Sequence, residues 1–226
     1  MLSRFTAIGF DLDGTLFDHR GSALVGVDEF LGSLGVATTA FAHELWLAAE
    51  ATHFERWRAG EITFEEQRRE RLRTVLPALG IEAPDRPAAL DALFARYADA
   101  YRRSWRAFDD AAQLLRLLRR SGLRLGLLTN GTREQQHDKL RAIGLIDEFD
   151  VICISEEIGV AKPDARAFSA LAEQLEVDPD QCLFVGDNAE HDVLGASAAG
   201  MAPLLVDRYG QHSGGITDSV LAHLSR

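Results

Sequence analysis

The stretch AIGFDLDGTLFD, residues 7–18, begins with an apolar run that ends in two acids separated by one residue. A short apolar run that ends at a turn-forming residue predicts a buried strand. Asp11 and Asp13 then lie at the end of that strand, and residues spaced by two on an extended chain point to the same side. Gly14 follows directly and lets the backbone turn away, so that both acids can face a ligand. Because two like charges repel each other as solvent is excluded, a positively charged group is expected beside them.

Four more short apolar runs follow in the second half of the chain, and segments with helical periodicity separate them. The runs lie at about 123–130, 150–155, 181–187 and 202–206, and the helical segments at about 132–143, 163–176 and 189–199. Alternation of strand and helix predicts a parallel sheet with helices on both faces.

Single residues predict where these helices begin and end. Thr132 is expected to cap the helix that follows it, and Pro163 is expected just inside the start of the next one. Glycines stand where three helices should stop, at Gly122, Gly144 and Gly200.

The pattern changes between residue 18 and about residue 105, where strand-like runs nearly vanish and helical periodicity dominates. A helical insert of this length is too long to be a simple crossover between two strands. The sequence therefore predicts an α/β fold. Residues 1–17 and 106–226 would form a Rossmann-like parallel sheet core, and residues 18–105 an inserted helical cap domain.

Polar side chains follow each predicted strand, at the edge where open parallel sheets bind their ligands. Beyond the first strand, these residues are Thr129, Asn130, Lys162, Asp187 and Asp192. Clustered carboxylates of this kind suit Mg²⁺, which takes hard oxygen ligands and leaves room for a phosphate oxygen. One acid of the first pair can attack phosphorus while the other handles protons. Thr129 and Asn130 are predicted to bind phosphate, and Lys162 to offset its charge.

Lysine is rare in this chain. Of its 24 basic residues only Lys139 and Lys162 are lysines, and all the others are arginines. A site that needs a compact ammonium group is therefore expected to use one of these two positions.

The motifs DLDGT, LLTNG, VAKPD and GDNAEHD stand in the order of the four motifs of the haloacid dehalogenase-like hydrolase superfamily, which the chain resembles over essentially its whole length. The insert looks like that family's cap of the first type. The resemblance implies that Asp11 is a nucleophile forming an aspartyl-phosphate, and that Asp13 is a general acid and base. It also implies Mg²⁺ held by Asp11, the main-chain carbonyl of Asp13 and Asp187, with Asp192 in support. The stretch 129–164 further resembles pyrimidine nucleotidases and acylneuraminate 9-phosphatases. The expected activity is hydrolysis of a nucleoside monophosphate or sugar phosphate.

Each motif also has a simpler interpretation. Residues 129–131 can form a strand-to-helix turn, Lys162 can be a surface lysine, and Asp187 and Asp192 can be charges at a helix start. A calcium loop is excluded for the first motif, because Thr15 and Leu16 stand where an acid or Asn and a Gly are needed.

Three other functions remain open within this fold. The 2-haloacid dehalogenases use the same first aspartate without a metal, but they lack the second acid, Asp13. A phosphomutase returns the phosphoryl group to another hydroxyl, and a non-catalytic phosphate-binding module would be expected to have lost some of the charged residues.

One stretch of the insert is a candidate for substrate specificity. Arg56, Trp57 and Arg58 precede a glycine turn, and an aromatic ring between two arginines can stack a base and hold an acidic group. The alternative is that these residues serve helix packing and surface charge.

Composition limits the partners of the protein. With 24 Lys plus Arg against 35 Asp plus Glu, the net charge of −11 disfavours nucleic acid polymers and anionic membranes. No run of 18 apolar residues occurs, and the first residues lack a signal-peptide pattern, so a cytoplasmic protein is expected. Cys153 and Cys182 lie in apolar runs and are predicted to be core residues rather than a disulfide or metal pair. The expected partner is a small phosphorylated metabolite, and the expected state is a monomer or homodimer.

Overall fold

The computed structural model describes residues 5–210 and 215–225, so the first four residues, which enter the signal-peptide expectation, lie outside them. The chain forms two compact units. The first consists of Met1–His19 and Arg106–Arg226, and the second of Arg20–Trp105.

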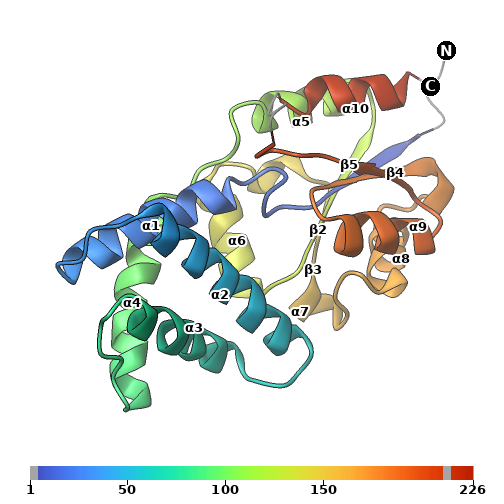
Figure 1. Cartoon of the computed structure of the whole chain (residues 1–226). Coiled ribbons are helices and arrows are strands. Elements are labelled where there is room, and N and C mark those ends of the chain that lie inside the picture. The colour runs from blue at the N-terminus through green and yellow to red at the C-terminus, as the bar shows by residue number, and fades with distance from the viewer. Residues whose placement is uncertain (1–4, 211–214, 226) are drawn as a thin grey trace. The chain divides into compact units, whose positions relative to one another are not determined.

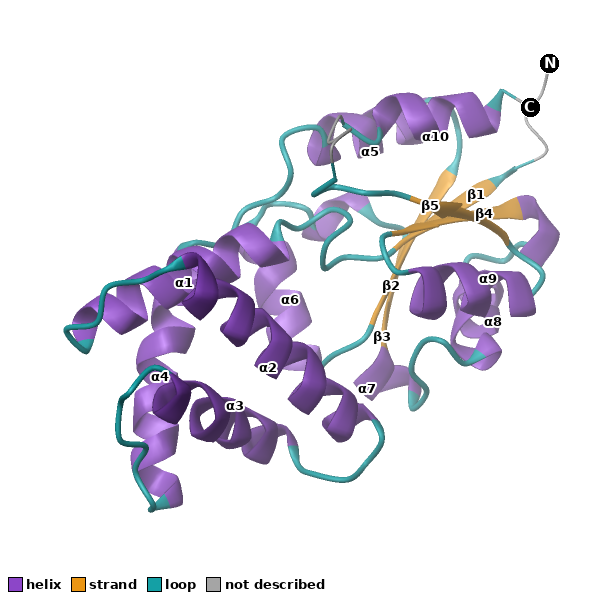
Figure 2. Cartoon of the chain, viewed as in Figure 1, coloured by secondary structure: helices purple, strands orange, loops and turns teal. Residues whose placement is uncertain are grey.

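The first unit contains a five-stranded sheet in the order β3-β2-β1-β4-β5 (Figure 2). Its strands are β1 (Ala7–Phe10), β2 (Arg124–Thr129), β3 (Val151–Ile154), β4 (Cys182–Gly186) and β5 (Ala202–Leu205). All four neighbouring pairs are parallel, with Phe10 opposite Leu127 on one side and Val185 on the other. The predicted α/β fold with a parallel sheet is confirmed.

The strand order reverses beside β1. The chain first runs outward from β1 through β2 to β3, and then returns to the other side of β1 to add β4 and β5. In open α/β sheets the ligand site forms at the carboxyl ends of the strands next to such a reversal. The carboxyl end of β1, which Asp11 directly follows, is therefore the expected centre of a ligand-binding site.

Helices of the first unit cover both faces of the sheet, as predicted. They are α5 (Ala111–Arg120), α6 (Arg133–Ala142), α7 (Ser155–Ile158), α8 (Ala165–Gln174), α9 (Gly195–Ala198) and α10 (Thr217–Leu224), with the short turns η1 (Ile146–Glu148) and η2 (Pro179–Gln181) and the π-helical segment η3 (Ala189–Leu194). Figure 1 shows α5 and α10 on one face and α8 and α9 on the other. Accordingly, α5 packs against β2, and α8 packs against β2 and β3.

The predicted helix ends are mostly confirmed. Thr132 caps α6 by accepting a hydrogen bond from the main-chain N–H of Gln135, and Gly122, Gly144 and Gly200 follow the ends of α5, α6 and α9 with positive φ.

The prediction that Pro163 lies just inside a helix was wrong. Helix α8 begins at Ala165, because Asp164 caps it and accepts a hydrogen bond of 2.9 Å from the main-chain N–H of Arg166. Pro163 precedes the cap and follows a cis peptide bond with Lys162.

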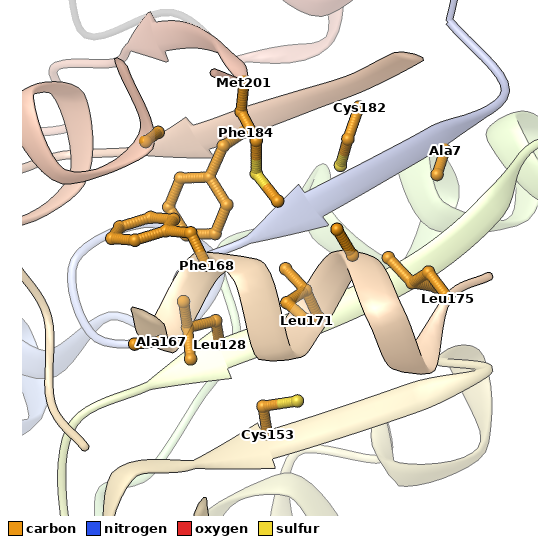
Figure 3. Close-up of a cluster of buried hydrophobic side chains, with 12 residues drawn as sticks. Ala7, Leu128, Cys153, Ala167, Phe168, Leu171, Leu175, Cys182, Phe184 and Met201 are labelled. Carbon is orange, nitrogen blue, oxygen red and sulfur yellow. The ribbon is translucent and has the colours of Figure 1, made fainter. Parts of the chain in front are cut away.

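A cluster of buried side chains fills the space between the sheet and α8 (Figure 3). Phe168 and Leu171 of α8 pack toward Phe184 of β4 and toward short side chains of the neighbouring strands. Cys153 and Cys182 belong to this cluster, and both are free and buried, which confirms the prediction for them. Burial raises the pKa of the Cys153 thiol to about 11 and that of the Cys182 thiol to about 12, so both thiols are protonated at neutral pH.

The second unit, residues 20–105, contains helices joined by loops. It contains α2 (Ala40–Arg58), α3 (Phe64–Ala78) and α4 (Pro87–Arg103), together with α1 (His19–Ser33), which begins at the last residue of the first unit's N-terminal segment. Its core is aromatic: the rings of Trp46 and Tyr97 lie 4.3 Å apart, and Phe30 and Phe94 pack around them. Among the helices of residues 5–210 and 215–225, none combines the length and the apolar character that crossing a membrane requires.

Candidate active site

Asp11 directly follows β1 and is buried, with 6% of its surface exposed. Its main-chain N–H donates to the carbonyl of Val185, which ties the end of β1 to β4. The ammonium group of Lys162 donates to Asp11 Oδ1 at 2.5 Å and to Asp192 Oδ1 at 2.6 Å. Although burial opposes a charged lysine, these two carboxylates outweigh it and raise the pKa of Lys162. The site therefore contains a buried cation shared between two buried acids.

A third acid joins Asp11 and Asp192. One carboxylate oxygen from each of Asp11, Asp187 and Asp192 lies within 4.8 Å of the others. Burial, with the repulsion of Asp192, raises the pKa of Asp187 to about 6, and burial likewise raises the pKa of Asp11 well above its usual value. A single ammonium group thus leaves the negative charge of this group incompletely balanced.

Asp11 Oδ2 is buried and has no hydrogen-bond partner among the described residues. A buried carboxylate oxygen without a partner is costly, and it indicates an atom that meets a ligand. Together with the hard oxygen donors of Asp187 and Asp192, this atom fits a divalent cation such as Mg²⁺.

Gly14 allows the loop after β1 to approach Asp187. The residue has a φ of +91°, and a Cβ atom at this position would overlap the Asp187 carboxylate. Its main-chain N–H donates to the carbonyl of Phe17 at 2.9 Å and closes a tight turn. Glycine is therefore required here both for the backbone conformation and for space.

Asp192 is positioned by η3, a π-helical segment. Asn188 caps this segment, and its side chain accepts hydrogen bonds from the main-chain N–H groups of Glu190 and His191. The main-chain N–H of Asn188 in turn donates to Asp192 Oδ2 at 3.0 Å. Both oxygens of Asp192 are thereby engaged, one with Lys162 and one with its own loop.

The carboxylate of Asp13 is held separately from this acidic group. Lys139 Nζ donates to its Oδ1 at 2.5 Å and Gln136 Nε2 donates to its Oδ2 at 2.9 Å. Burial would raise the pKa of Asp13, but Lys139 and then His19 outweigh it, and the net effect is a lowered pKa. Asp13 is therefore ionised at neutral pH.

The predicted phosphate-binding residues lie on neighbouring loops. Thr129 is buried at the end of β2, and its hydroxyl accepts a hydrogen bond of 2.6 Å from Gln136. The Asn130 amide pairs with the main chain of Lys162, donating to its carbonyl at 2.9 Å and accepting from its N–H at 2.8 Å. Asn130 thus fixes the loop that carries Lys162, while its contact with phosphate stays a prediction.

A family model described as haloacid dehalogenase-like hydrolase matches residues 5–200. The chain belongs to the haloacid dehalogenase-like hydrolase family. All four motifs quoted from the sequence lie within the matched residues.

Two curated relatives of this haloacid dehalogenase-like hydrolase are phosphate ester hydrolases by name. The phosphoserine phosphatase of Thermus thermophilus is 40% identical over 141 residues, which cover 62% of this chain and 55% of that protein. The pyrimidine 5'-nucleotidase YjjG of Escherichia coli is 43% identical over 93 residues, 41% of each chain. The chain therefore spans about half the length of these curated relatives.

Solved structures extend the similarity to nearly the whole chain. The HAD-hydrolase YfnB of Bacillus subtilis, bound to magnesium, matches with a TM-score of 0.74 and 23% identity over 90% of this chain and 87% of that one. The L-2-haloacid dehalogenase of Xanthobacter autotrophicus matches with a TM-score of 0.70 and 27% identity over 96% of this chain and 83% of that one.

The candidate specificity residues of this family member are Arg56, Trp57 and Arg58. They lie in the second unit and contact other side chains of that unit. Arg56 donates to Glu61 and to His53, and Arg58 forms an ion pair with Glu55. The Trp57 ring packs edge to face on two phenylalanines of the same unit, at 4.8 and 5.0 Å. These contacts fit the alternative of packing and surface charge, and a role in substrate recognition stays a prediction.

Sequence reasoning did not single out Gln136 as a site residue and noted Lys139 only as a rare lysine. Both lie on α6, and both contact Asp13. The rarity of lysine could have identified Lys139 as a site residue, because Lys139 and Lys162 are the only two lysines in the chain.

Proposed function

We propose that the protein is a Mg²⁺-dependent phosphatase that hydrolyses small phosphate monoesters, a nucleoside monophosphate or a sugar phosphate, through an aspartyl-phosphate on Asp11. The observation that carries this proposal is the buried Asp11 carboxylate. Lys162 holds one of its oxygens, the other has no partner within residues 5–210 and 215–225, and a second acid follows two residues along the chain. Phosphatases among the relatives, at 40% and 43% identity, support the same reaction class.

In the first half of the reaction, Thr129, Asn130 and Lys162 hold the phosphate group beside Asp11. An oxygen of Asp11 attacks phosphorus, and the bond from phosphorus to the ester oxygen breaks. Asp13, which is ionised in the resting site, takes up a proton as the phosphate ester binds and gives it to the leaving oxygen, which departs as an alcohol. The products of this half are a phosphorylated Asp11 and an ionised Asp13.

In the second half, Asp13 takes a proton from water as the water oxygen attacks phosphorus. The bond between phosphorus and Asp11 breaks, inorganic phosphate leaves, and the Asp11 carboxylate is restored. Asp13 then releases to solvent the proton that it took from water and returns to its ionised resting form. Lys162 offsets charge at Asp11 throughout, because it contacts this carboxylate in the resting site.

Asp11, the main-chain carbonyl of Asp13 and Asp187 would hold Mg²⁺, with Asp192 in support. When bound, the ion neutralises charge on the phosphate oxygens and on the acids around them. The raised pKa values of Asp11 and Asp187 support this assignment, because a cation relieves the repulsion and burial that raise them.

A 2-haloacid dehalogenase is the second candidate, favoured by the 27% identity to the L-2-haloacid dehalogenase of Xanthobacter autotrophicus. Asp13 argues against this candidate, because dehalogenases lack an acid at that motif position. In this chain Asp13 is present and accepts hydrogen bonds from Gln136 and Lys139. A phosphomutase or a non-catalytic phosphate-binding module would be recognised by the outcome of the experiment below.

The proposal extends to partners and location. We infer that the protein acts in the cytoplasm on a small phosphorylated metabolite, as a monomer or homodimer, without binding nucleic acid polymers or membranes. The net charge of −11 supports this inference, since it opposes association with polyanions.

Release of inorganic phosphate from a panel of nucleotides, sugar phosphates and phosphoglycolate, with Mg²⁺ and with a chelator, tests the proposal. We expect turnover that requires Mg²⁺ and that falls at least about a thousandfold in Asp11→Asn, because the nucleophile is lost. Asp109→Asn removes an exposed acid from the same unit and should leave turnover unchanged. Hydrolysis at the wild-type rate by Asp11→Asn would refute the mechanism. If the wild-type protein released no phosphate, halide release from 2-chloropropionate and isomerisation of sugar phosphates would test the other candidates.

A further inference from the structure

The two lysines of the chain are both buried, and each contacts a different acid of the first motif. Lys162 donates to Asp11, and Lys139 donates to Asp13. Their exposed fractions are 4% and 2%, although basic side chains are rarely fully buried unless they are paired. All 22 other basic residues are arginines, so both lysine side chains of this protein contact these two carboxylates.

Lys139 shares its contact with Asp13 with Gln136, which lies one turn earlier on α6. Side chains three residues apart share one face of a helix, so α6 presents both donors to the same carboxylate. Gln136 donates to one oxygen of Asp13 and Lys139 to the other, so the orientation of the carboxylate is fixed at both atoms. Gln136 also donates to the hydroxyl of Thr129, which links the orientation of Asp13 to the predicted phosphate-binding loop.

A structural role alone does not favour a cation over an apolar side chain at this position. Burying an ammonium group costs free energy that an apolar side chain of similar length would not. The partner of Lys139 is also partly exposed, with 28% of the Asp13 side-chain surface accessible, so the pair is not needed to satisfy a fully buried acid. The ammonium group also lies 5.0 Å from the centre of the Phe17 ring, within the range of a cation–π contact, and methionine is a suitable replacement because its sulfur likewise packs on aromatic rings.

We propose that Lys139 is a positioning residue that, with Gln136, orients the Asp13 carboxylate for proton transfer to the leaving oxygen and from the attacking water. This inference rests on the proposed phosphatase function. Proton transfer requires the acid within hydrogen-bond reach of the reacting oxygen, and a displacement of about 1 Å can cost about a hundredfold in rate.

Lys139→Met tests the proposal with two substrates that differ in their need for an acid. The value of kcat/KM, which reports the step that breaks the ester bond, is measured for an alkyl phosphate and for 4-nitrophenyl phosphate, whose leaving group needs little protonation. We expect a decrease of about tenfold to a hundredfold for the alkyl ester and less than about threefold for the nitrophenyl ester. Gln136→Met should show the same selectivity with a smaller decrease, and it replaces Lys139→Met if that variant does not fold.

Combination with Asp13→Asn shows whether Lys139 acts through Asp13. We expect Lys139→Met to cause no further decrease in the Asp13→Asn background, whereas a residue that supports the fold by another route would lower activity in both backgrounds. Arg141→Met removes a positive charge from the exposed side of the same helix and should leave both substrates unaffected. Equal losses for the two esters, or additive losses in the double variant, would overturn the proposal.

A crystal structure of Lys139→Met separates this inference from the proposed function. We expect its Asp13 carboxylate to leave the orientation found beside Gln136 and Lys139 in the wild-type chain. An unmoved carboxylate would overturn the positioning role even in an active enzyme. Absence of phosphate release from the wild-type protein would overturn the function instead, and the orientation of Asp13 would still decide whether Lys139 sets it.

Discussion

The arrangement of the candidate site depends on glycine at position 14, because glycine has no side chain. The loop after β1 and the loop after β4 meet at this residue, where a Cβ atom would overlap the Asp187 carboxylate. The cation site proposed at Asp11 and Asp187 requires that this space stays open.

If Asp187 holds Mg²⁺ as proposed, we expect Gly14→Ala to displace it and to raise the half-saturating Mg²⁺ concentration for activity by at least about tenfold, since one proposed charged ligand is moved. Gly159→Ala is the matched control, because Gly159 also has a positive φ, +73°, but has no atom within 4 Å of an added Cβ. The control carries the backbone strain without the overlap. An equal effect in both variants would show that strain, and not the displacement of Asp187, is responsible.

The location of a site residue could be predicted from the sequence where it depends only on spacing along the chain. Asp11 and Asp13 follow a strand directly, so their location at its end needed no knowledge of tertiary structure. The contacts of Lys139 and Asn130 were not predictable, because they depend on which face of α6 and which loop lie beside Asp13 and Lys162. The chemical roles of all these residues remain predictions.

At the scale of elements, each strand of the sheet lies within a predicted apolar run. The order of the strands was not predicted, because a crossover of a given length can place the next strand on either side of β1. The π-helical segment η3 was predicted only as part of an ordinary helix. Its capping by Asn188 is a local contact that helical periodicity does not reveal, and the contact between Asp192 and Lys162 depends on tertiary structure.

In the second unit, a buried histidine links two helices. Arg56 donates to His53 Nδ1, so the proton of the neutral ring lies on Nε2, which donates to the Thr74 hydroxyl of α3 at 2.9 Å. Burial, and then the Arg56 guanidinium, lower the pKa of His53 despite the opposing effect of Glu70. The folded state therefore favours the neutral ring.

This arrangement predicts a pH dependence of stability. An unfolded histidine has a pKa of about 6.5, so the contribution of His53 is complete above that pH and is lost as the pH falls below it. We expect the free energy of unfolding of His53→Gln to depend less steeply on pH between 7 and 5 than that of the wild type, by at most about 1.4 kcal/mol per pH unit. Urea titrations at several pH values measure the difference.

His223→Gln on α10 is the control, because it removes a histidine and leaves the contacts of His53 intact. Parallel slopes for the wild type and His53→Gln would contradict the prediction.

The whole molecule presents an arginine-rich, acidic surface, and both of its lysines lie in the interior. Reaction of lysine side chains with an acetylating ester should therefore require opening of the first unit. We expect Lys139 and Lys162 to react at least about a hundredfold more slowly in native buffer than in denaturant, as measured by mass spectrometry of peptides.

An Arg120→Lys variant provides the reference, because residue 120 is exposed at the end of α5. The introduced lysine should react at similar rates in both conditions. Fast native labelling of Lys139 would mean that its pair with Asp13 opens readily.

The two free thiols, buried on β3 and β4, give the protein a practical property. Because both are protonated and inaccessible in the folded state, a single cysteine introduced on the surface would be the one thiol that a maleimide dye or spin label reaches. Labels placed in pairs, one on each compact unit, would then report the distance between the units by fluorescence transfer or electron spin resonance, without prior removal of the native cysteines.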